Sequence, residues 1–465
     1  MSLMISVILN TDGYKPSMFK QMPPGTSHVY SYIESRGGRY DATVMFGLQI
    51  FIKEYLTRQI TMADIDEAEE LMGPYGAPFN REGWEYIVER HNGYLPLEIR
   101  AVPEGTVVPV KNVLATVVNT DPACFWLTSY IETALLRAVW YGTTVATVSW
   151  SIKQVVKDYS NRTGSSAGML YTLNDFGARG VSSMESSGIG GAAHLVNFDG
   201  TDNIAGMLYA RKYYNAGAVG GTVPAAEHCT ITSWGRGREV DAYANMLAQF
   251  ARPGSVVAVV SDSYDIYHAA SKLWGEELRQ QVIDSGATVV IRPDSGDPVE
   301  VNRLLVEILG EKFGYTVNDK GFKVLNHVRL IQGDGVNELS IRSILGAFTA
   351  MGWSAENIIF GMGGQLLQQI DRDTQKFALK CSTACINGEW VDVQKDPITD
   401  SGKKSKTGRV TLWKSGDEFV SSVKQPTSWT DKGVGPWEEA LETVFLNGKI
   451  VREYDFAEVR ANANR

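Results

Sequence analysis

Residues 256–296 read VVAVVSDSYDIYHAASKLWGEELRQQVIDSGATVVIRPDSG and alternate between two kinds of pattern. The short apolar runs at 256–260 and 287–291 are rich in β-branched residues, which is typical of buried strands. Residues 266–283, between them, repeat apolar positions at helical spacing. A strand, a helix and a second strand in this order form a parallel βα unit, so the stretch predicts an α/β fold.

The same rhythm continues along the chain. Helical patterns at 299–311 and 341–351 alternate with apolar strands at 328–331 and 358–360. Earlier, an aromatic-rich strand at 27–34, a helix at 65–72 and Pro/Gly-punctuated strands at 97–118 indicate a different architecture. We therefore expect an irregular βα barrel over residues 151–389, and a second, mixed α+β domain built from both chain ends, 1–150 and 390–465.

Composition excludes several classes of function. The chain has 465 residues, 44% hydrophobic and 21% charged, which is ordinary for a globular protein. Its net charge of −9 argues against a nucleic-acid partner, because nucleic-acid-binding surfaces are usually basic. Four cysteines are too few for a disulfide framework, and no apolar run is long enough to span a membrane. We expect a cytoplasmic protein with no membrane partner.

Each predicted strand ends in a polar or glycine-rich turn. These turns are Ser261-Asp262-Ser263, Arg292-Pro293-Asp294-Ser295-Gly296, Gln332-Gly333-Asp334-Gly335 and Gly361-Met362-Gly363-Gly364. In a βα barrel the chemistry collects at the carboxyl ends of the strands. Arginine, aspartate and backbone N–H groups suit phosphate and ribose hydroxyls, so the sequence predicts a sugar-phosphate site there.

Two of these turns carry charged candidates. Arg292 and Asp294 are two residues apart, so they share a side if the strand continues. They could hold a phosphate with one side chain and ribose hydroxyls or a Mg²⁺ ion with the other, or simply form an ion pair at the barrel mouth. Asp334 lies between Gly333 and Gly335, where a ligand can approach the backbone closely. Gly363 and Gly364 would present N–H groups to a phosphate.

Four residues outside these turns are further candidates. Phe176 and Arg179 follow an expected strand at 170–173; Phe176 could stack on a planar heterocycle or be plain core, and Arg179 could meet an anion. Asp202 could accept hydrogen bonds from an amide or cap the next helix. His228 could be a general base, a phosphate contact, a nucleophile or a structural histidine.

Long motifs in a fixed order show a resemblance over nearly the whole chain. They are Thr11-Asp12-Gly13-Tyr14-Lys15, Tyr30-Ser31-Tyr32, residues 175–183, Val223-Pro224-Ala225-Ala226-Glu227-His228, residues 261–265, residues 291–296, residues 331–335 and Lys395-Asp396-Pro397. With these motifs the chain resembles the nicotinamide phosphoribosyltransferases, a type II phosphoribosyltransferase family. The resemblance implies transfer of phosphoribosyl from 5-phosphoribosyl 1-diphosphate to nicotinamide, which gives nicotinamide mononucleotide and diphosphate in NAD salvage.

The resemblance also implies roles for individual residues. Phe176, and Tyr14 of a second subunit, would clamp the nicotinamide ring in a homodimer with shared sites, and Asp202 would bind its carboxamide and repel nicotinate. The diphosphate would be bound by Arg179, His228 and Arg292, together with Arg36 and Lys380. The ribose would be bound by Asp294, Asp334 and Gly333, and the 5′-phosphate by Gly363, Gly364 and Arg372. Asp262 would lie near Mg²⁺. His228 matches the histidine that family members phosphorylate with ATP, so the resemblance implies coupling of ATP hydrolysis to synthesis.

Departures from the family pattern are small. Met362 stands where relatives often carry serine, and Gly13 and Thr222 also differ locally. Two alternatives stay open: a nicotinate-using phosphoribosyltransferase of the same fold, and a non-catalytic ligand-binding or signalling relative.

Overall fold

The computed structural model describes residues 5–76, 78–396, 404–426 and 436–465. Pro397 of the motif at 395–397 lies outside these ranges. Two compact units make up the fold: residues 1–147, 211–216 and 370–465 form unit 1, and residues 148–210 and 217–369 form unit 2. The helix α5 (Glu132–Thr163) contributes residues to both units.

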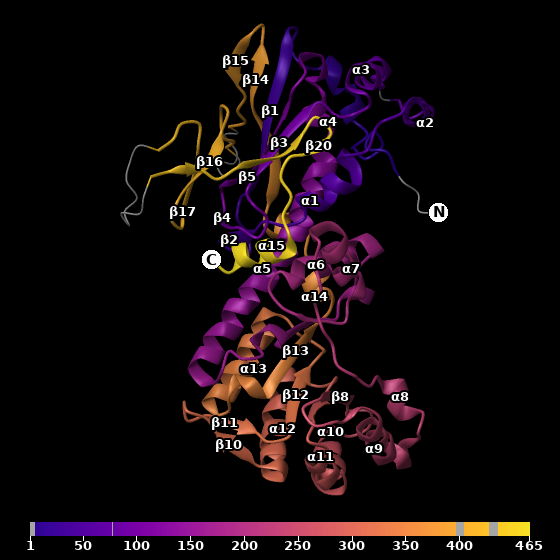
Figure 1. Ribbon diagram of the computed structural model, residues 1–465, viewed down its shortest axis with the longest axis vertical. Coiled ribbons are helices and arrows are strands. Elements are labelled where there is room, and N and C mark those ends of the chain that lie inside the picture. The colour runs from indigo at the N-terminus through magenta and orange to yellow at the C-terminus, as the bar shows by residue number, and fades with distance from the viewer. Residues whose placement is uncertain (1–4, 77, 397–403, 427–435) are drawn as a thin grey trace. The chain divides into compact units, whose positions relative to one another are not determined.

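Unit 1 is built on an antiparallel sheet of seven strands. In spatial order these are β15 (Glu389–Asp392), β14 (Phe377–Ile386), β1 (Thr26–Ser35), β5 (Val113–Asn119), β3 (Leu97–Ala101), β19 (Glu442–Leu446) and β20 (Lys449–Ile450). The indigo β1 lies beside the orange β14, so both chain ends share this sheet (Figure 1). In β1 the last seven residues are all buried, which makes it the core strand of the unit.

Smaller elements complete unit 1. Its additional strands pair as β2 (Ala42–Val44) with β4 (Val107–Pro109), and as β16 (Thr411–Ser415) with β17 (Glu418–Ser422) and β18 (Glu438–Glu439). Its helices include α1 (Leu48–Phe51), α2 (Met62–Met72), α3 (Arg81–His91), α4 (Leu127–Tyr130) and α15 (Phe456–Ala463). The α2 helix begins at a capping box between Thr61 and Asp64, which satisfies two backbone N–H groups.

Unit 2 contains a parallel sheet of six strands. Their order is β7 (Gly200–Thr201), β6 (Leu173–Asp175), β13 (Ile358–Met362), β12 (Val328–Gln332), β9 (Thr288–Arg292) and β8 (Val256–Val260). Its helices include α6 (Met184–Leu195), α8 (His228–Thr232), α9 (Glu239–Phe250), α10 (Ile266–His268), α11 (Arg279–Ser285), α12 (Pro298–Phe313), α13 (Glu338–Ala350) and α14 (Gly364–Leu367). The helix α7 (Ile204–Tyr214) begins in unit 2 and ends in unit 1. The strands β10 (Tyr315–Val317) and β11 (Lys323–Leu325) form a separate hairpin. The predicted α/β fold with parallel βα units is confirmed.

A segment outside the named strands joins the two edges of this sheet. Gly221 bridges to Gly200 of β7, and Ala225 bridges to Ala258 of β8, both in parallel orientation. Pro224 has no N–H but still accepts a 2.9 Å hydrogen bond from the Ala258 N–H. Residues 221–226 therefore close the sheet into an irregular barrel, and they lead directly to His228.

The barrel interior is a small apolar cluster. Ala258, Val290 and Ile331 are buried together, with Phe176, Val223, Val256 and Ile359 packed against them. These residues come from β8, β9, β12, β13, the closing segment and the turn after β6, so side chains from neighbouring strands pack together inside the barrel.

Two predicted elements were wrong in detail. The strand expected at 170–173 is β6 at Leu173–Asp175, because a 3₁₀ turn at Met169–Tyr171 follows Gly168, whose φ of 79° suits glycine. The helix expected at 266–283 is divided: α10 passes into a π-helical segment, Ala269–Glu277, before α11. A Cβ on Gly275 would lie 2.6 Å from Lys312 Cγ, so glycine permits close packing on α12 at that irregularity.

Candidate active site

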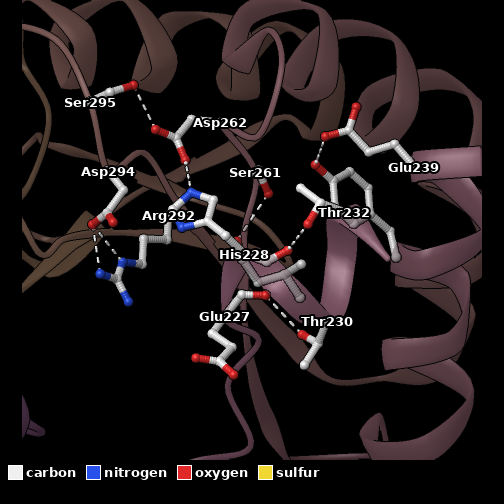
Figure 2. Close-up of polar contacts among 12 residues, drawn as sticks. Glu227, His228, Thr230, Thr232, Glu239, Ser261, Asp262, Arg292, Asp294 and Ser295 are labelled. Carbon is white, nitrogen blue, oxygen red and sulfur yellow. Dashed lines mark hydrogen bonds and ion pairs between the residues drawn. The ribbon is translucent and has the colours of Figure 1, made fainter. Parts of the chain in front are cut away.

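His228 and Asp262 form a pair at the mouth of the barrel. The His228 imidazole is 47% exposed at the start of α8, whereas the Asp262 side chain, just after β8, is only 4% exposed. Nε2 of His228 lies 3.0 Å from Asp262 Oδ1, and the other carboxylate oxygen accepts a 2.6 Å hydrogen bond from Ser295 (Figure 2). A carboxylate accepts hydrogen bonds, so Nε2 is the donor in this pair, and Nδ1 is the ring nitrogen that a ligand can reach.

Arg292 and Asp294 form an ion pair on the neighbouring strand end. Nε and Nη2 of Arg292 donate to Asp294 Oδ1 over 3.0 and 2.6 Å. The two side chains are 27% and 22% exposed, so the pair remains accessible to a ligand. A Cβ on Gly333 would lie 3.0 Å from the Arg292 guanidinium, which shows how closely Arg292 lies against the next strand end. The ion pair is present, and it leaves Asp294 Oδ2 without a hydrogen bond from Arg292.

Phe176 packs against the core and also lies beside a charged residue of the site. The ring is half-buried on the apolar cluster of the barrel interior, yet it also lies 5.7 Å from the Arg292 guanidinium carbon. A Cβ on Gly361 would come within 2.0 Å of the ring. Gly361 therefore provides the space that Phe176 occupies. The aromatic ring lies close enough to the Arg292 guanidinium for both to contact one ligand.

Asp202 is exposed and does not cap the following helix. Its Oδ1 accepts a 2.6 Å hydrogen bond from the Thr222 hydroxyl of the closing segment. Asn203, the next residue, accepts the Gly206 N–H of α7 instead. The carboxylate of Asp202 is therefore available to a ligand. From the sequence, Thr222 was identified only as a local departure from the family pattern. Its contact with Asp202 forms because residues 221–226 pair with the edge strand β7.

Sequence reasoning missed Asp175, the last residue of β6. Its side chain is fully buried, and burial raises the pKa of the carboxyl to about 6, with nearby Asp202 adding to the rise. Oδ1 accepts a 2.7 Å hydrogen bond from the Gly177 N–H, and Oδ2 accepts one of 2.8 Å from Asn203 Nδ2. The position of Asp175 immediately before Phe176 was the signal available in the sequence.

Four predicted residues of unit 2 are not tied to Arg292, Asp294 or Phe176 by a side-chain hydrogen bond or ion pair within the described residues. Arg179 and Asp334 are exposed, and within the described ranges neither side chain makes a hydrogen bond or ion pair. A Cβ on Gly364 would meet nothing within 4 Å, and one on Gly363 would meet only the Phe176 carbonyl oxygen, at 3.8 Å. Internal packing therefore does not require glycine at either position.

The other four predicted residues, Tyr14, Arg36, Arg372 and Lys380, belong to unit 1. Three of them lie in a basic cluster: burial and the charges of Arg36, Lys395 and Arg372 lower the pKa of Lys380, and Glu132 opposes the effect. Arg36 also pairs with Glu34 over 3.2 Å. Tyr14 is 61% exposed. A cluster of like charges that depresses a lysine pKa is suited to an anion with several charges.

Comparisons with known proteins identify the family. The model of the nicotinate phosphoribosyltransferase family matches residues 171–448, and that of the nicotinamide phosphoribosyltransferase N-terminal domain matches residues 6–99. A Xanthomonas campestris pv. campestris protein named nicotinamide phosphoribosyltransferase is 56% identical over 463 residues, which cover 99% of this chain and 98% of that protein. The chain belongs to the nicotinamide phosphoribosyltransferase family.

More distant relatives agree on the family and the fold. A nicotinamide phosphoribosyltransferase of Acinetobacter baylyi is 33% identical over 99% of this chain and 97% of its own length. Among solved structures, human nicotinic acid phosphoribosyltransferase has a TM-score of 0.60 at 15% identity, covering 98% of this chain and 93% of that one. The nicotinate-nucleotide pyrophosphorylase of Pyrococcus furiosus has a TM-score of 0.62 at 16% identity, covering 98% and 95%. These two structures share the fold with this chain.

The described part of this family member offers one further group of metal-type side chains, in unit 1. It comprises His91, Asp121 and Cys124, whose ligand atoms lie within 4.8 Å of one another. His91 Nε2 and Asp121 Oδ2 are 2.7 Å apart, the separation of a direct hydrogen bond, and Tyr86 donates to the same oxygen. Burial raises the pKa of the Cys124 thiol to about 12. Hydrogen bonding thus accounts for this group.

Within the described residues, no helix combines the length and the apolar content needed to cross a membrane.

Proposed function

We propose that the chain transfers the phosphoribosyl group of 5-phosphoribosyl 1-diphosphate to nicotinamide, forming nicotinamide mononucleotide and diphosphate. The observation that carries this proposal is the cluster in unit 2, where Phe176 lies beside Arg292 and Arg292 holds Asp294. An aromatic face, a guanidinium and a carboxylate at one barrel mouth match a planar base, a diphosphate and a ribose.

Positioning and charge stabilisation account for the chemistry. As the bond from ribose C1 to diphosphate lengthens, Arg292 and Arg179 stabilise the charge that grows on the leaving group. Asp294 and Asp334 hold the ribose hydroxyls, and Gly333 lets Arg292 lie close to them. The pyridine nitrogen attacks C1 through its own lone pair, so no residue has to remove a proton and proximity supplies much of the rate.

Asp202 selects the base. Its exposed carboxylate, held by Thr222, accepts hydrogen bonds from the NH₂ of a carboxamide. Nicotinate presents a carboxylate at the same place, and two negative charges in contact repel each other. This repulsion favours nicotinamide over the nicotinate-using alternative.

The residues at the barrel mouth fit a magnesium ion that arrives with the diphosphate. Mg²⁺ binds protein through one or two carboxylates and keeps waters and phosphate oxygens as its other ligands. Asp294 Oδ2 and the exposed Asp334 can provide such oxygens, and each oxygen of Asp262 accepts one hydrogen bond and keeps a second lone pair. When bound, the ion adds positive charge at the leaving diphosphate.

His228 would accept a phosphate from ATP. Because Nε2 faces Asp262, the nucleophile is Nδ1 on an imidazole that is 47% exposed. The Asp262 carboxylate would stabilise the positive charge that the ring gains when Nδ1 attacks the γ-phosphate and ADP leaves. Hydrolysis of the phosphohistidine would then favour product formation.

We further propose a homodimer in which unit 1 of one copy completes the site in unit 2 of the other. The exposed Tyr14 would cover the second face of the base, and the basic cluster of Arg36, Arg372 and Lys380 would meet the phosphates. All four cysteines are unpaired, which supports a cytoplasmic location.

A direct assay tests the proposal. Purified protein is given 5-phosphoribosyl 1-diphosphate, Mg²⁺ and either nicotinamide or nicotinate, with and without ATP, and the mononucleotides are separated and quantified. We expect nicotinamide mononucleotide, with a higher kcat/KM than for nicotinate and a further gain with ATP. Faster use of nicotinate would overturn the choice of base, and folded protein that forms neither product would support a non-catalytic role.

A further inference from the structure

Asp175 connects the two turns that carry the base-recognition residues. Its Oδ1 accepts the N–H of Gly177, which directly follows Phe176, over 2.7 Å. Its Oδ2 accepts Nδ2 of Asn203, which directly follows Asp202, over 2.8 Å. Its backbone carbonyl accepts the Asp202 N–H over 3.0 Å. Hydrogen bonds to this one residue thus hold the two turns next to each other.

The contacts around Asp175 fix the direction of each hydrogen bond. Asn203 Nδ2 also donates to the Ser187 carbonyl, while its Oδ1 accepts from the Ser187 hydroxyl and from the Gly206 N–H. The amide orientation of Asn203 is therefore determined, and Nδ2 must face Asp175. Both oxygens of Asp175 then face donors, a pattern that only the ionised carboxylate satisfies completely.

We propose that Asp175 is a positioning residue for base recognition, whose buried carboxylate sets the Phe176 turn against the Asp202 turn. The inference rests on the proposed function, because it assigns the nicotinamide ring to Phe176 and its carboxamide to Asp202. Asp175 itself touches neither the base nor the ribose in this assignment; it acts through the two turns.

The charge state of Asp175 links this role to pH. Its pKa is raised to about 6 by burial, and Asp202, on the turn after β7, is the charged group that adds to the rise. The other side chains that contact it, Asn203 and through it Ser187, are neutral. As the pH falls through about 6, one oxygen becomes a hydroxyl that faces a donor, so one turn loses its hydrogen bond.

The test is the Asp175→Asn variant, which has the same shape but only one acceptor oxygen. Its NH₂ group must face the Gly177 N–H or the Asn203 NH₂, so we expect the KM for nicotinamide to rise about tenfold. The KM for 5-phosphoribosyl 1-diphosphate should change less than about twofold, because Arg292 and Asp294 do not contact Asp175. An unchanged nicotinamide KM in the variant, with active wild-type protein, overturns the inference.

The pH profile separates positioning from a general loss of stability. In the wild-type protein the nicotinamide KM should rise as the pH falls from 7.5 to 5.5, and in Asp175→Asn this rise should be absent. The remaining groups of the site are the same in both proteins, so the difference between the two profiles reports Asp175. Parallel profiles contradict the role.

A control variant completes the design. Glu104→Gln is the matched control: Glu104 is a buried carboxylate of unit 1 that accepts hydrogen bonds from the Gly47 and Gln49 N–H groups, and its loss should lower the melting temperature but not raise the nicotinamide KM. If the wild-type protein makes no nucleotide at all, the proposed function fails, and the inference fails with it.

Discussion

At the scale of single residues, the pair of His228 and Asp262 serves the coupling to ATP hydrolysis in the proposed function, whereas other residues serve the phosphoribosyl transfer. Only Nδ1 of His228 is free for phosphate, because Nε2 is held by Asp262. We predict that His228→Ala abolishes the stimulation by ATP but retains measurable transfer, since the base and ribose contacts are made by other residues. Radiolabelled ATP and an acid-labile, base-stable phosphoprotein band would follow the coupling. Label that persists on the variant protein would place the phosphate elsewhere.

Asp202 carries the prediction on specificity. Asp202→Asn removes the negative charge yet keeps the size and the hydrogen bond with Thr222, so repulsion of nicotinate should weaken. We expect the ratio of kcat/KM for nicotinamide over nicotinate to fall by about tenfold or more. Competition between the two bases measures this ratio directly. A ratio equal to that of the wild-type protein would remove Asp202 from base recognition.

Residues whose role is local were predictable, and those whose role depends on barrel closure were not. Arg292 and Asp294 are neighbours in sequence, so their pairing follows from strand geometry. The contacts of Asp175 with Asn203 and of Thr222 with Asp202 join segments that only the folded sheet brings together. A single sequence contains no signal for such pairs.

At the scale of elements, the alternation of strand and helix patterns predicted most strands of the parallel sheet but not the segment that joins its two edges. The apolar runs of β8, β9, β12 and β13 are continuous because parallel strands are buried on both faces. Residues 221–226 make only single bridges on each side and contain Pro224, so they show no strand pattern although they close the barrel. The π-helical segment at Ala269–Glu277 was equally hidden, because it depends on packing between Gly275 and α12.

The glycines after β13 give a prediction at this scale. Gly364→Ala adds a methyl group in open space, so stability should be unchanged, whereas the KM for 5-phosphoribosyl 1-diphosphate should rise several-fold if a phosphate approaches that backbone. Gly361→Ala is the contrast: its Cβ would lie 2.0 Å from the Phe176 ring, so it should lower the melting temperature by several degrees and weaken nicotinamide binding. Thermal melts and the two KM values separate the cases. Equal effects on both substrates in Gly364→Ala would argue against a phosphate subsite.

At the scale of the whole molecule, the predicted site residues divide between the two units. Phe176, Asp202, His228, Arg292 and Asp294 belong to unit 2, and Tyr14, Arg36, Arg372 and Lys380 belong to unit 1. The turns of unit 2 indicated the first group from their own residues, whereas the second group was predicted through the family resemblance alone, because nothing local connects a tyrosine at position 14 with a barrel strand. Whether one chain or two supply a complete site is therefore a question for subunit mixing.

Complementation between inactive variants answers it. Asp294→Ala damages unit 2, and Lys380→Ala damages unit 1. In a symmetric dimer with shared sites, a mixed dimer contains one site with both defects and one intact site, so an equal mixture should recover about a quarter of wild-type activity after subunit exchange. Asp294→Ala mixed with Phe176→Ala, both in unit 2, should recover none, because every site then has a defective barrel. Recovery in neither mixture, with exchange verified by tagged subunits, would mean that each chain forms its site alone.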